Sequence, residues 1–206
     1  ILLLIGVNVS ATNYTLSSSS ITISTPGSHT LSGSGSGAVY ITNSTVDAVY
    51  NITLNDINLV SATWGSAINV QNTSTGTMTV NFIVIGTNVT NAYNHGGIQS
   101  TGGTIKVVFT TTSSGTLTST ARYAGYYAFN NANSSTLTPS IASGITCTAT
   151  LGGTSMAVAS ALSGAFTSRP LVLTLAASPS ISYASPQTYL KGVAITALIP
   201  TSSGGG

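Results

Sequence analysis

Acidic side chains are almost absent from this chain of 206 residues. It has no glutamate, and its only carboxylates are Asp47 and Asp56. A glycosidase needs two carboxylates beside the scissile bond, and a metal centre needs clustered carboxylate, imidazole or thiolate ligands. The two aspartates, His29, His95 and Cys147 form no such cluster along the sequence. We therefore predict that the protein is not an enzyme and has no catalytic residue, no metal site and no cofactor.

Basic side chains are also scarce. The formal net charge is +2, and charged residues make up 3% of the chain, against about 25% in an ordinary globular protein. Nucleic acids and anionic membranes are bound by clustered lysine and arginine, so we expect neither as a partner. A surface with so little charge lacks the repulsion that keeps monomers apart. We therefore expect the main partner to be the protein itself, as a homopolymer.

Long apolar runs and disulfides are also lacking. Cys147 is the only cysteine, so it is expected to be a small buried hydrophobic residue. No run reaches the ~18 apolar residues of a membrane span. One short apolar run opens the chain, and it consists of Ile1, Leu2, Leu3, Leu4, Ile5 and Val7. It is either the end of a signal-peptide hydrophobic region or an assembly strand that pairs within the subunit or inserts into a neighbour.

The chain is instead rich in short β-branched segments separated by Gly, Ser, Thr and Asn. Hydrophobic residues make up 42%, and the mean hydropathy is +0.40. Strand-like segments with frequent alternation occur at residues 20–23, 39–42, 51–54, 77–80 and 105–109. The one helical candidate, residues 154–166, has no clean polar face. The sequence therefore predicts an all-β protein.

Several features recur about every 30 residues. Apolar triplets of similar character end at Val39, Ile68, Ile98 and Phe129, and the series extends to Val158. A second apolar set lies at residues 52–54, 80–82, 107–109 and Leu137. Turn residues repeat as well: Asn43, Asn72 and Asn130 lie on a 29-residue grid, with Thr101 in the vacant place. Such a period is typical of a β-solenoid, in which equivalent asparagines form hydrogen-bonded ladders.

The repeat defines three expected regions. Residues 1–19 are the apolar assembly segment, residues 20–150 the solenoid, and residues 151–206 a β-rich cap with a flexible tail. Strands are expected at 171–175 and 193–197, and prolines interrupt the last region. A cap is expected because an open solenoid end leaves strand edges unpaired. The alternative fold is a β-sandwich assembled by donor-strand exchange.

Four segments carry a family resemblance. Residues 21–33 (ITISTPGSHTLSG), 38–41 (AVYI), 52–59 (ITLNDINL) and 67–70 (AINV) resemble, in order and spacing, secreted right-handed parallel β-helix proteins described as carbohydrate-binding-domain-containing. The resemblance covers roughly residues 20–120 and implies a right-handed parallel β-helix. The overall composition is similar to that of archaeal extracellular filament subunits.

One catalytic motif and one row of aromatic residues need separate interpretation. Residues 153–157 (GTSMA) resemble the nucleophile motif of subtilisin-like proteases, which would make Ser155 the nucleophile. The required His and Asp lie in none of that family's motifs, so we interpret the match as coincidence. Trp64, Tyr93 and Tyr123 recur at intervals of 29 and 30. They predict an aromatic stripe that binds glycan or contacts a subunit.

The predicted function is structural. We expect a secreted, cell-surface protein that self-assembles into an extracellular filament or surface layer and provides cohesion, adhesion or protection. Glycans would supply hydration in place of charge. The glycosylation sequons lie at Asn8, Asn13, Asn43, Asn51, Asn72, Asn88 and Asn133. The alternative function is a carbohydrate-binding adhesin module whose partner is a surface polysaccharide.

Overall fold

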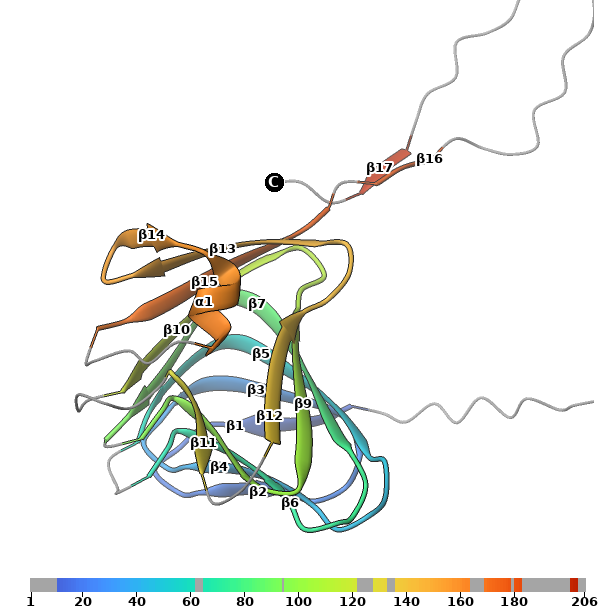
Figure 1. Cartoon of the computed structure of the whole chain (residues 1–206), viewed down its shortest axis with the longest axis vertical. Helices are drawn as coiled ribbons and strands as arrows, with labels where there is room; N and C mark the ends of the chain where they lie inside the picture. The colour runs from blue at the N-terminus through green and yellow to red at the C-terminus, as the bar shows by residue number, and fades with distance from the viewer. Residues whose placement is uncertain are drawn as a thin grey trace, which may run out of the picture.

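The computed structural model describes residues 11–61, 65–93, 95–121, 128–132, 136–163, 169–178, 180–182 and 201–203. Strands dominate these residues, which confirms the all-β class (Figure 1). Among them the only helix is α1 (Val158–Ser163). No helix of the described segments is long and apolar enough to cross a membrane. Residues 1–10 of the expected assembly segment and the expected strand at 193–197 lie outside the described residues, whereas residues 12–15 of that segment form a strand.

One sheet has five strands, all parallel. Its order is β11 (Phe129–Ala132), β8 (Ile98–Gly102), β6 (Ile68–Asn72), β4 (Val39–Asn43) and β2 (Ile21–Ile23). Each of the three inner strands, β8, β6 and β4, therefore pairs with the equivalent strands of the preceding and following repeats.

The predicted repeat sets the register of this sheet. Val39 lies opposite Ile68, Ile68 opposite Ile98, and Ile98 opposite Phe129. All four side chains are buried, because residues in register on neighbouring strands point to the same face of the sheet. The predicted alignment is thus confirmed for these four positions. Its extension to Val158 is wrong, because Val158 begins α1.

The second sheet has ten strands. They are β1 (Thr12–Thr15), β3 (Gly27–Gly35), β5 (Val49–Val60), β7 (Met78–Ala92), β9 (Thr104–Thr110), β10 (Ser114–Ala121), β12 (Thr136–Ile141), β13 (Ile145–Leu151), β14 (Thr154–Met156) and β15 (Leu171–Ala177). Strands β1, β3, β5 and β7 follow one another in parallel. The first part of β7 then pairs with β9, and its second part pairs with β10. Strand β12 pairs with β9 in parallel.

The second apolar set aligns only in part, and its last member, Leu137, lies opposite Ile105, outside residues 107–109. Phe82 lies opposite Phe109 as predicted, but Ile52 lies opposite Phe82 and not opposite Val80. The Phe82 and Phe109 rings stack at a centroid distance of 5.8 Å, and Phe109 lies 5.0 Å from the Phe129 ring of the other sheet. These aromatic contacts join the inner faces of the two sheets into one core.

The parallel stacking ends in antiparallel strands at the C-terminal side. Strand β15 pairs antiparallel with β10, β13 with β15, and β14 with β13. Helix α1 contacts β12 and β13 and buries Ala161. In Figure 1 these elements lie above the parallel strands. The predicted strand at 171–175 is confirmed as part of β15. The short strands β16 (Ser180–Ser182) and β17 (Thr201–Ser203) pair separately with each other.

Candidate functional site

Both carboxylates accept a hydrogen bond from the main chain of the following repeat, Asp47 from a turn before β5 and Asp56 from within β5. Asp47 and Asp56 adopt positive φ angles of 53° and 51°. Asp47 Oδ1 accepts a hydrogen bond of 3.0 Å from the Thr77 amide, and Asp56 Oδ1 accepts one of 2.7 Å from the Thr87 amide. Asp47 therefore holds the main chain 30 residues further along, just before β7, and Asp56 holds it 31 residues further along, within β7. The two carboxylates thus act at separate places in the fold.

Glycine makes room for both carboxylates. A Cβ on Gly76 would lie 2.9 Å from Asp47 Oδ1, and a Cβ on Gly86 would overlap Asp56 Oδ1. Gly86 also has a φ of +69°, which disfavours any other residue. Sequence reasoning missed this pairing of an aspartate with a glycine one repeat later. The sequence contains this signal, because each aspartate is followed about one repeat later by a glycine: Asp47 by Gly76, and Asp56 by Gly86.

The asparagine ladder has two members in the described chain. Asn43 Nδ2 donates a hydrogen bond of 3.0 Å to Asn72 Oδ1. The predicted grid fails beyond this pair, because Gly102 and not Thr101 lies opposite Asn72. Asn130 lies opposite Gln99. The reason is that paired residues are 30 positions apart between β6 and β8 and 31 positions apart between β8 and β11, which is longer than the 29-residue grid.

Three predicted glycosylation sites are corrected by their burial. Asn43, Asn72 and Asn88 are 2%, 1% and 0% exposed. Asn88 Oδ1 accepts a hydrogen bond from the Ile57 amide (3.1 Å), and its Nδ2 donates to the Ile85 carbonyl (2.9 Å). A glycan on any of these amide nitrogens would displace core hydrogen bonds, so this fold excludes it.

The remaining sequons differ in accessibility. Asn13 is exposed on β1, and Asn51 is half-buried on β5, where its Oδ1 accepts a hydrogen bond of 2.8 Å from Asn81 Nδ2. Asn8 and Asn133 lie outside the described residues. Asn13 is therefore the most accessible described sequon.

His29 is a buried histidine held by the main chain. It points inward from β3, is 5% exposed, and its Nε2 lies 2.8 Å from the Thr25 carbonyl oxygen. Its ring lies 6.0 Å from that of Tyr14 and 6.5 Å from that of Tyr50. The Tyr50 hydroxyl donates to the Thr42 carbonyl at 2.8 Å, and burial raises the pKa of Tyr50. These contacts assign the imidazole and the phenol a packing role.

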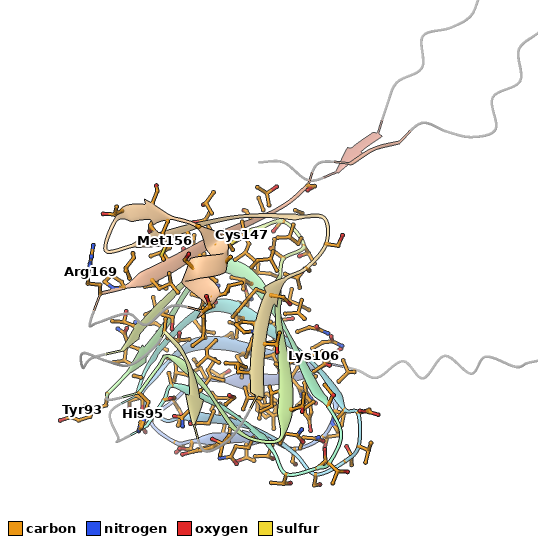
Figure 2. The ribbon with its side chains drawn as sticks, in the orientation of Figure 1. Tyr93, His95, Lys106, Cys147, Met156 and Arg169 are labelled. Atoms are coloured by element: carbon orange, nitrogen blue, oxygen red, sulfur yellow. The ribbon has the colours of Figure 1, made fainter. Side chains whose placement is uncertain are left out.

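The other candidate site residues lie apart from His29, Tyr14 and Tyr50. Ser155 is exposed on β14 opposite Thr150. Cys147 is half-buried on β13, and burial raises the pKa of its thiol. Tyr93 is half-buried and lies at the same corner as His95 (Figure 2). Its proposed partners in an aromatic stripe, Trp64 and Tyr123, lie outside the described residues, so the stripe stays a prediction.

The two sheets end together at the N-terminal side. Strands β1 and β2 are the first strands of the ten-stranded and five-stranded sheets, and no strand of the described residues pairs with their outer sides. Neither strand contains a charged residue or a proline. We call the outer sides of residues 12–15 and 21–23 the N-terminal edge.

Comparisons with known proteins identify no relative that could be compared at these features. No protein-family model, curated protein or solved structure matches this chain.

Proposed function

We propose that this chain is a non-catalytic structural subunit of an extracellular filament or cell-surface assembly. We also propose that its stacked strands form a right-handed parallel β-helix closed at the C-terminal side by the antiparallel cap. The alignment of Val39, Ile68, Ile98 and Phe129 in successive parallel strands supports this architecture.

The observation that carries the functional proposal is the uncharged N-terminal edge. Natural proteins usually protect exposed strand edges with lysine, proline, bulges or a covering element. Strands β1 and β2 have none of the first three, and their outer sides are unpaired among the described residues. With only 3% charged residues in the whole chain, little repulsion opposes association. Self-assembly is the function that this surface favours.

The chain's few reactive groups support the structural assignment. Both carboxylates accept hydrogen bonds from main-chain amides, and His29 Nε2 lies 2.8 Å from the Thr25 carbonyl oxygen. These bonds hold the main chain and do not join the three side chains into a shared site. The assembly strand at residues 1–7, secretion, and glycans at accessible sequons such as Asn13 belong to the same proposal.

Electron microscopy of the native material and of the purified chain tests this function. We expect ordered polymers that lengthen as the protein concentration rises. A chain that stays dispersed at every concentration, and is found dispersed in the native material, would contradict the proposal.

A second candidate function is a carbohydrate-binding adhesin module. The observation that favours it is a row of outward side chains on the five-stranded sheet, in which Tyr40 lies opposite Asn69 and Asn69 opposite Gln99. An aromatic ring beside amides suits a neutral sugar, which stacks on the ring and hydrogen-bonds to the amides. Binding of a soluble polysaccharide by a monomer, lost in Tyr40→Ala and kept in Thr53→Ala on the other sheet, would favour this module.

A further inference from the structure

The N-terminal edge carries unpaired main-chain groups whose direction is fixed by the existing hydrogen bonds. The Ile21 amide donates to the Ala38 carbonyl at 3.0 Å, toward β4. In a parallel ladder, alternate residues direct both their N–H and C=O groups to the same neighbour. The N–H and C=O of Thr22 therefore point away from β4, to the outer side.

Strand β1 has the same arrangement. The Leu16 amide donates to the Ser32 carbonyl at 2.9 Å, toward β3. By the same alternation, the main-chain groups of Asn13 and Thr15 point to the outer side. Three residues of the N-terminal edge thus present both donors and acceptors outward, so the edge is complementary to another copy of itself.

The opposite end of the stack is better protected. Strand β15 covers β10, and α1 contacts β12. Strand β12 also contains Pro139, which has no N–H to donate. At that end β11 of the five-stranded sheet and β14 of the antiparallel cap are uncharged strands without proline, whereas at the N-terminal edge both stacks of parallel strands end in such strands.

We propose that the N-terminal edge is a self-association site that pairs with the N-terminal edge of a second copy of this chain. This inference rests on the proposed function and names its first assembly contact. A two-fold axis relates the two copies, so the facing strands run antiparallel and the same residues contribute from each side. The paired subunits are then the repeating unit of the larger assembly.

The test compares two lysine substitutions in the full chain. Thr22→Lys places a charge on the N-terminal edge, and Gln71→Lys places the same charge on the same face, in the middle of the sheet. Molar mass is measured by sedimentation across a concentration series. We expect the molar mass of the wild type and of Gln71→Lys to double from 20.6 kDa as the concentration rises. Thr22→Lys should need an at least tenfold higher concentration to form the same dimer.

A second pair of variants isolates the main-chain donor. Thr22→Ala keeps the outward N–H, whereas Thr22→Pro removes it. We expect only the proline variant to weaken pairing, with unchanged circular dichroism. If the proline variant misfolds, hydrogen exchange of the wild-type amides provides the test. The Thr22 amide should become more protected from exchange as the protein concentration rises. The Ile21 amide is already hydrogen-bonded, so its protection should not change.

The outcomes separate this inference from the proposed function. Filaments that form equally well from Thr22→Lys would overturn the inference and leave the structural function standing. Edge-dependent dimers without any larger polymer would support the inference and count against the filament. A wild type that is monomeric throughout, or that polymerises without passing through a dimer, would also overturn the edge-to-edge pairing.

Discussion

Replacement of Asn72 by alanine tests whether the buried turn amides stabilise the stacked repeats. Asn72 Nδ2 donates to the Gly76 carbonyl (2.9 Å) and the Thr104 carbonyl (3.0 Å). Its Oδ1 accepts from the Ser74 amide (3.1 Å), the Ser74 hydroxyl (2.8 Å) and Asn43 Nδ2 (3.0 Å). One side chain therefore joins three successive repeats, and its truncation removes all of these bonds together.

The expected cost follows from the number of bonds and from burial. A typical hydrogen bond contributes about 0.5–1.5 kcal/mol net, and a buried group left without a partner costs about 1–3 kcal/mol. Asn72 is 1% exposed, so water does not readily replace the lost amide. Because the five bonds are not independent, we expect Asn72→Ala to lower the free energy of unfolding by about 3 kcal/mol.

The assay is urea unfolding followed by circular dichroism, with the slope of the free energy against urea checked for constancy. The matched control is Gln71→Ala, the neighbouring outward residue, which should change stability by about 0.5 kcal/mol or less. Asn72→Asp keeps an acceptor but loses the donors, so it should be at least as destabilising as Asn72→Ala. The reasoning is refuted if Asn72→Ala lies within about 1 kcal/mol of the control.

Three further predictions test the turns, the core and the surface. Gly86→Ala should cost about 2 kcal/mol more than Gly144→Ala, since both glycines have positive φ but only at Gly86 would a Cβ overlap a carboxylate; equal unfolding midpoints would contradict this. Burial raises the folded-state pKa of Tyr50, so its stabilising contribution is complete below pH ~10 and is lost as the pH rises through that raised pKa. Tyr50→Phe should therefore lose less stability on alkaline titration, and an identical loss would refute the assignment. Mass spectrometry of native peptides should find any glycan on the exposed Asn13 in unassembled protein and none on the buried Asn88; a glycan on Asn88 would contradict this fold.

The strand positions were predictable because burial imposes a local pattern. Val39, Ile68 and Ile98 each follow small residues and each begins a short alternating segment, so their spacing revealed the parallel register before any coordinates. The same reasoning failed at Val158, because an alanine-rich segment forms α1 once it packs against β12 and β13.

The turns were less predictable because their contacts join different repeats. Whether Asn88 is a sequon on the surface or an amide in the core depends on the direction of its side chain at a strand corner. Register irregularities occur at that corner in β5. The role of Asp56 likewise depends on the position of the Thr87 amide, one repeat later. Neither the two-residue alternation of a strand nor the 30-residue repeat specifies the direction of the Asn88 side chain or the position of Thr87.

The internal and terminal strands of this protein differ in one physical respect. An internal strand such as β4 directs its alternate main-chain groups to a neighbour on each side, and its Asn43 side chain also bonds to Asn72 in the next repeat. Strands β1 and β2 have such a neighbour on one side only among the described residues. In the proposed pairing, a second copy would supply the missing neighbour without requiring any charge, pocket or cofactor. In a chain with 3% charged residues, the contact that stabilises each repeat is therefore also the contact best suited to join one subunit to the next.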